Sequence, residues 1–82
     1  NLKTNVSGRA TITVHVWGNT DMRLEVIEAL DKFLNLREIE SDNFKFEMRF
    51  NDSTTQILND TSVANTVLIH GIATLVFDWF RK

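Results

Sequence analysis

The chain has no cysteine and no proline, and only three of its 82 residues are glycine. Without cysteine it forms no disulfide and offers no thiolate to a metal, which removes two common ways of stabilising a short chain. The two histidines, His15 and His70, are far apart in the sequence, so we expect no structural metal site. Oligomerisation is the remaining common way for a small domain to gain buried surface.

Motifs for catalysis are missing from the sequence as well. There is no glycine-rich phosphate loop, no nucleophile elbow and no spacing of metal ligands. A chain with three glycines and none of these motifs offers little from which to build an active site. We therefore predict that the protein is not an enzyme and that it holds no cofactor.

Positive charge is not in excess either, because the formal net charge is −2. This balance disfavours a nucleic-acid partner that is bound mainly through phosphate neutralisation. Acidic residues gather at 20–42, where Glu25, Glu28 and Asp31 would share one face of a helix. Such a face could bind a basic partner, but we interpret it as an ordinary solvated surface.

The length and the hydrophobic content of 43% fit a single globular domain over residues 1–82, with residues 1–8 as a flexible lead-in. The lack of cysteine favours the cytoplasm. Glycosylation sequons at Asn5, Asn51 and Asn59 keep a luminal or extracellular origin open.

Two segments alternate between apolar and polar residues, which is typical of half-buried strands. The first is 9–17 and the second is 44–50, in which aromatic residues and methionine alternate with charged ones. A short third strand at 54–59 rests on two apolar residues only, and 38–43 is polar enough to be a connection. Between the two strong strands, 20–36 has the one-sided apolar stripe of an amphipathic helix.

The segment 63–80 does not alternate, and we predict a second helix there. Polar residues recur every four positions, at Thr66, His70, Thr74 and Asp78, and would form one narrow stripe on a helix. Its β-branched residues leave strands open as an alternative. We expect no membrane span, because polar and charged groups lie inside the apolar stretch.

These elements predict an α+β domain of the order β-α-β-(β)-α, with two helices packed on one face of a two- to three-stranded sheet. The helices would cover the apolar residues of the two strong strands, which are Ile12, Val14, Val16, Phe44, Phe46, Met48 and Phe50. The other sheet face would be open.

Two surfaces of this predicted fold could then bind a partner or a ligand. The predicted C-terminal helix is apolar over about half its circumference, more than contact with one sheet needs. Its candidate interface residues are Ile69, Ile72, Val76, Trp79 and Phe80. The second surface is the open sheet face, where a ligand would meet His15, Trp17, Lys45 and Arg49.

We therefore predict a non-enzymatic protein-interaction or assembly module that associates with itself or with a protein partner through its C-terminal segment. Two alternatives are a small oligonucleotide-binding domain that uses the open sheet face and a small regulatory inhibitor or adaptor. An acid–base role for His70 with Asp78 is disfavoured, because residues eight apart on a helix lie about 12 Å apart along its axis.

Overall fold

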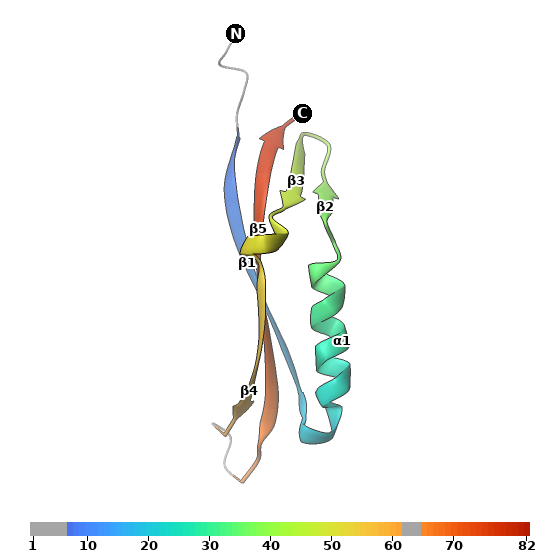
Figure 1. Ribbon diagram of the computed structural model, residues 1–82, viewed down its shortest axis with the longest axis vertical. Helices are drawn as coiled ribbons and strands as arrows, with labels where there is room; N and C mark the ends of the chain where they lie inside the picture. The colour runs from blue at the N-terminus through green and yellow to red at the C-terminus, as the bar shows by residue number, and fades with distance from the viewer. Residues whose placement is uncertain (1–6, 62–64) are drawn as a thin grey trace.

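A computed structural model describes residues 7–61 and 65–82, and within them the chain forms five strands and one α-helix (Figure 1). The elements are β1 (Ser7–Asn19), α1 (Arg23–Leu34), β2 (Glu38–Glu40), β3 (Phe44–Met48), β4 (Thr54–Asp60) and β5 (Leu68–Arg81). Short 3₁₀ turns, η2 (Thr20–Met22) and η3 (Phe50–Asp52), precede α1 and β4. No helix of the described residues is long and apolar enough to cross a membrane.

The strand β5 is the centre of one antiparallel sheet. One of its edges pairs with β1 along the whole length, from Ser7 opposite Phe80 to Asn19 opposite Leu68. Its other edge is shared, since β3 pairs with the C-terminal third of β5 and β4 with the N-terminal half. The short β2 pairs with β3, so the strand order is β1-β5-β3-β2 with β4 beside β5.

The chain leaves β5 briefly between β3 and β4. Residues 49–53 lie opposite only Leu75 and Val76, because η3 loops outward at this point. The backbone of Val76 is nevertheless bonded: its carbonyl accepts from the Arg49 N–H at 2.7 Å, and its N–H donates to Ser53 Oγ at 3.0 Å. The serine hydroxyl thus replaces a missing strand contact in the middle of the sheet.

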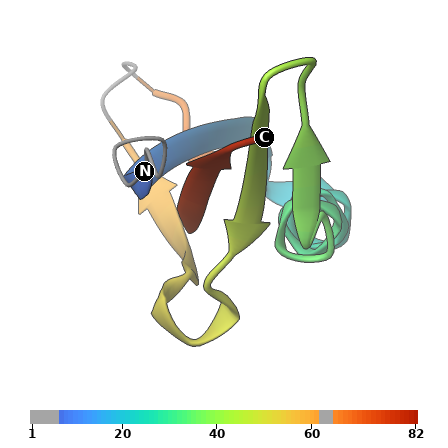
Figure 2. The same ribbon diagram turned by 90° about the horizontal axis from the view of Figure 1, so that it is seen from above.

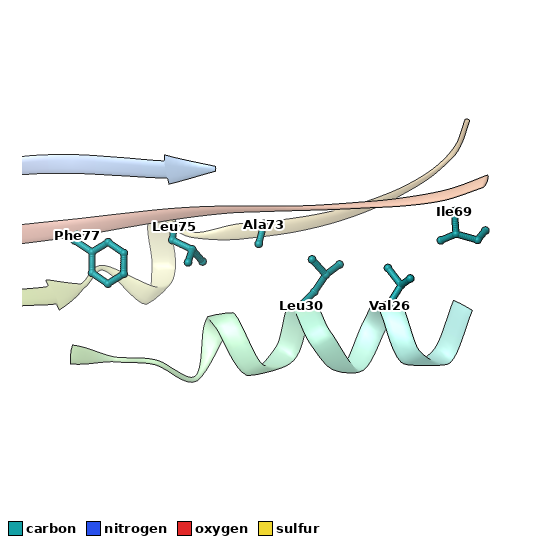
Figure 3. Close-up of a cluster of buried hydrophobic side chains, with 6 residues drawn as sticks. All are labelled: Val26, Leu30, Ile69, Ala73, Leu75 and Phe77. Atoms are coloured by element: carbon teal, nitrogen blue, oxygen red, sulfur yellow. The ribbon is translucent and has the colours of Figure 1, made fainter. Parts of the chain in front are cut away.

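One face of β5 holds the hydrophobic core. Its odd-numbered residues from Ile69 to Phe77 are all buried, and Val26 and Leu30 of α1 pack against them (Figure 3). Gly71 lies directly under the helix, where an added Cβ would be 2.7 Å from Val26 Cγ1. The absence of a side chain at Gly71 therefore lets α1 approach the sheet closely.

The molecule is elongated and narrow, not spherical. A strand of the 14 residues of β5 extends about 46 Å, whereas the molecule is only 23 × 21 Å across. The 12-residue α1 is about 18 Å long, and it lies outside one face of the sheet (Figure 2). A single helix of this length covers less than half of the sheet, so the buried core is small.

The prediction of two helices on a two- to three-stranded sheet is wrong, and the error lies in 63–80. This segment contributes the strand β5 over Leu68–Arg81, while residues 62–64 lie outside the described part. A polar residue at every fourth position fits a helical stripe, but four is also a multiple of two. His70, Thr74 and Asp78 therefore share one face of a strand as well. The apolar residues between them reflect the central position of β5: its odd-numbered residues from Ile69 to Phe77 are buried on the helix side, and its even-numbered residues are half-buried among the side chains of the strands on either side.

The other elements follow the sequence more closely. The helix predicted at 20–36 is present as α1, and the strands predicted at 9–17, 44–50 and 54–59 are β1, β3 and β4 with shifted ends. The interpretation of 38–43 as a plain connection is wrong, because β2 and β3 form a small hairpin there. Two residues of the proposed lead-in, Ser7 and Gly8, belong to β1; residues 1–6 lie outside the described part.

Candidate functional site

The face of the sheet opposite α1 is formed by odd-numbered residues of β1 and even-numbered residues of β5, which we call the open face. Cross-strand pairing places Trp17 beside His70 and His15 beside Ile72. On the other side of β5, Lys45 lies beside Phe80. Of the four residues suggested by the sequence as a ligand face, His15, Trp17 and Lys45 hold strand positions on this side, whereas Arg49 lies just beyond the end of β3 and reaches this face through its hydrogen bond to Asp78.

A stack of rings occupies one end of the open face. The rings of Trp17 and His70 are nearly parallel, with centroids 3.7 Å apart and planes at 10°. His15 Nδ1 lies 2.7 Å from His70 Nε2, so one of these nitrogens donates a hydrogen bond to the other. Leu58 of β4 pairs with His70 from the opposite side and continues this row across the sheet.

Ion pairs occupy the other part of the open face. Asp78 Oδ2 accepts a hydrogen bond from Arg49 Nη1 at 3.0 Å, and Arg9 Nε lies 3.5 Å from Asp78 Oδ1. Arg49 also donates from Nε to Asp52 at 2.6 Å. The hydrogen bond from Arg49 is the main cause that lowers the pKa of Asp78, with a smaller contribution from Arg9. The carboxylates of Asp52 and Asp78 in turn raise the pKa of Arg49.

The positive charge of Lys45 is compensated by carboxylates in the same way. Its Nζ lies 3.6 Å from a carboxylate oxygen of Glu38 and 3.6 Å from one of Glu47, and the charge of Glu38 is the main cause that raises the pKa of Lys45. The lysine and Arg49 therefore have little positive potential left for a phosphate group. Ten residues of β5, or about 33 Å, also separate the strand position beside Lys45 from the one beside Trp17.

The five candidate interface residues do not lie on one surface. Ile72, Val76 and Phe80 belong to the open face, where they are half-buried. Ile69 is buried in the core under α1. Trp79 lies on the helix side beyond the end of α1, where its ring and that of Phe44 form a T-shaped pair. It lines a shallow apolar groove with Ala10, Phe44 and Phe46.

The acid–base pairing of His70 with Asp78 is not formed. Both lie on the open face, but eight residues of an extended strand, or about 26 Å, separate them. Glu25, Glu28 and Asp31 are exposed on α1. Among the described residues, no group of three or more histidines, cysteines or acidic residues is placed to bind a metal ion.

The sequence interpretation missed the outer edge of β1. This strand pairs with β5 along 13 consecutive residues, and no described strand pairs with its other side. It has no bulge and no proline, and Arg9 is its one charged residue. Native proteins usually protect a long edge with charges, prolines or bulges, because unpaired N–H and C=O groups invite another strand. The low charge and missing proline of 7–19 were the sequence signals for this edge.

The other outer edges of the sheet are shorter. The three residues of β2 include two glutamates, Glu38 and Glu40, which oppose strand addition. The seven residues of β4 end on an acid, Asp60. Among the strands of the described chain, β1 therefore presents the longest edge and the least protected one.

Two large apolar side chains are exposed along the same edge. Ile12 points to the helix side but lies beyond the cover of α1, and 44% of it is exposed. Trp17 is on the open face and is 49% exposed. One face of its indole stacks on His70 of β5, so the other face is directed away from β5, toward the free edge. The unpaired backbone of the β1 edge and these two apolar side chains thus form one surface.

Comparisons of the chain with known protein families, with curated proteins and with solved structures found no match.

Proposed function

We propose that the protein is a non-enzymatic assembly module that associates with itself by adding a strand to the outer edge of β1. The observation that supports this most directly is the 13-residue edge with one charged residue and no bulge. Main-chain hydrogen bonds to an added strand would supply affinity, and side chains on both faces would supply specificity.

The small core provides a second argument for association. Six hydrophobic residues of the described chain are buried, while Ile12 and Trp17 remain exposed at the edge. A domain of this length has a thin margin of stability, and association is a usual way to increase its buried apolar surface. Adding a strand at β1 would cover these two side chains without any change in the fold.

The test is the mass of the purified protein in solution, measured by sedimentation velocity at a low and a high concentration. We expect the wild type to shift toward a larger species as concentration rises. Thr13→Lys, an exposed substitution in the middle of β1, should prevent this shift, because charges oppose strand addition at an edge.

The matched control is Thr54→Lys. Thr13, Thr74 and Thr54 lie in one row across the sheet, so Thr54 is exposed on the same face but on the opposite edge, in β4. We expect this variant to associate like the wild type. A wild type that stays monomeric at the highest concentration would overturn the proposal. So would a loss of association in Thr54→Lys while Thr13→Lys still associates.

A further inference from the structure

The sequence of β1 is complementary to itself when it is reversed, and this defines a particular arrangement of two copies. If two β1 strands pair antiparallel with Thr13 opposite Thr13, all 13 residues of each strand are paired, from Ser7 opposite Asn19 to Asn19 opposite Ser7. We infer that two copies join in this register, about a two-fold axis through Thr13, into one continuous sheet; this inference rests on the proposed self-association.

Charge and ring placement favour this register. It puts Arg9 of each copy directly opposite Trp17 of the other, on the open face. The indole of Trp17 has one face on His70 and the other directed toward the edge, so a guanidinium can lie over the second face. The ion pair of Arg9 with Asp78 is long, with Nε 3.5 Å from Oδ1, and the Arg9 side chain is 58% exposed, so its guanidinium has room to stack on an indole.

The helix-side residues fit the same register. Ile12 of one copy lies opposite Val14 of the other, and Ala10 lies opposite Val16, so each exposed Ile12 gains an apolar, β-branched neighbour. Gly8 lies opposite Gly18, which keeps bulk away from the two ends. Both helices lie on the same side of the joined sheet, because residues directly opposite each other in an antiparallel pair point to the same face.

Neighbouring registers are less favourable. An axis through Ile12 or Val14 leaves two residues of each β1 unpaired. It also moves Arg9 away from the indole, to a position opposite His15 or Asn19. A two-fold axis that passes between two consecutive residues of β1 would pair the helix-side residues of one copy with the open-face residues of the other. The apolar sides of the two copies would then lie on opposite faces of the joined sheet.

Disulfide trapping tests the register, because the chain has no cysteine of its own. In the proposed dimer the two Thr13 residues face each other with Cα atoms about 4.5–5.5 Å apart, within the range that a disulfide spans. Thr13→Cys should therefore give a covalent dimer under mild oxidation, seen by mass spectrometry and on a non-reducing gel. Thr11→Cys is the matched control: the two copies of residue 11 lie about 13 Å apart along the strand, too far for a disulfide.

A double variant, Thr11→Cys with His15→Cys, completes the test. These positions are opposite each other between copies but about 13 Å apart within one chain, so the double variant should cross-link between chains. We expect Thr13→Cys and the double variant to form dimers at least ten times faster than Thr11→Cys alone. Equal rates, or a faster Thr11→Cys, would overturn the register.

The two proposals fail in different ways. If the wild type associates and Thr13→Lys prevents it, but Thr13→Cys does not cross-link, the self-association stands and the two-fold register is wrong. If the wild type is monomeric in sedimentation, both proposals fail together.

Discussion

The two faces of β5 have the same backbone and nearly the same hydrophobic content, but they differ in what covers them. On the odd-numbered face, Ala73 and Phe77 have no exposed surface, because α1 and the neighbouring strands enclose them. On the even-numbered face, His70, Ile72 and Val76 are only half-buried, because no described element packs over the sheet there. The first face is therefore fully covered within the monomer, whereas the side chains of the second face contact only their neighbours in the sheet.

This difference separates what holds the monomer together from what it can offer to another chain. Stability should depend mainly on the residues under α1 and at the β3 end of the core. The open face and the β1 edge should tolerate substitution in the monomer and matter for association. Three further predictions test this division, in order of decreasing effect.

The largest effect is expected from Phe77→Ala compared with Val76→Ala. These neighbours point to opposite faces of the same strand. Phe77 is fully buried and meets the ring of Phe46 edge to face, so its truncation should lower the free energy of unfolding by about 3–5 kcal/mol. Val76→Ala should cost about 1 kcal/mol, because Val76 is half-exposed.

Urea unfolding followed by circular dichroism measures both variants. If Phe77→Ala does not fold, Phe77→Leu provides a smaller truncation that should still cost more than Val76→Ala. Equal losses at positions 76 and 77 would show that the two faces contribute alike, contrary to the comparison.

An intermediate effect is expected from Gly71→Ala. The new methyl would lie 2.7 Å from Val26 Cγ1 and 3.0 Å from Leu30 Cδ1. Valine has little rotamer freedom in a helix and cannot turn aside, so α1 must move and we expect a loss of about 1–3 kcal/mol.

Val26→Ala should relieve this clash. The double variant Gly71→Ala with Val26→Ala should therefore be less destabilised than the sum of the two single variants, by about 0.5–3 kcal/mol. A double-mutant cycle of urea unfolding gives this coupling. Strict additivity would mean that the helix does not approach the sheet at Gly71 as closely as described.

The smallest effect is expected on the open face, from the acid dependence of Asp78. Because Arg49 lowers the pKa of Asp78 below its ordinary 3.8, the folded protein holds this proton less tightly than the unfolded chain does. The ion pair therefore stabilises the fold above the unfolded pKa, and this contribution is lost as the pH falls through the folded pKa. The loss should be modest, since both side chains are 39% exposed.

Asp78→Asn removes the titrating group, so its unfolding midpoint should fall less on acidification from pH 7 to pH 2 than that of the wild type. An unchanged acid dependence in Asp78→Asn would remove the ion pair as a source of stability.

Much of the local structure could be predicted from particular residues. The alternation of 9–17 and 44–50 gave two strands, and Val14, Val16, Phe46 and Met48 pack on the core as expected. Ile12 and Phe50, expected on the same face, are instead 44% and 47% exposed, and Phe50 lies in η3 beyond the end of the strand. The amphipathic stripe of 20–36 gave α1 and its buried Val26 and Leu30. In each case only one side of the element is covered, so the apolar residues recur with the single period of that element and identify it.

The candidate site was predicted only in part. The open-face positions of His15, Trp17 and Lys45 follow from strand alternation, whereas Arg49 lies beyond the end of β3 and reaches this face through its hydrogen bond to Asp78. Two other features depend on which strands become neighbours. Carboxylates from other elements compensate the charges of Lys45 and Arg49, and His70 completes the ring stack. His70 was expected on a helix, so its contact with Trp17, 53 residues earlier in the chain, could not be predicted.

The sequence alone therefore determined the strands and helix that face the core on one side, together with the absence of disulfides and of recognisable catalytic motifs. Only the tertiary structure decided that 68–80 form a strand and not a helix. An apolar segment with a polar residue every four positions satisfies both a helix and a strand, and pairing with β1, β3 and β4 selects the strand. The same pairing makes β5 the centre of the sheet and leaves β1 at its edge, because β5 can accept neighbours on two sides and β1 has a partner on one.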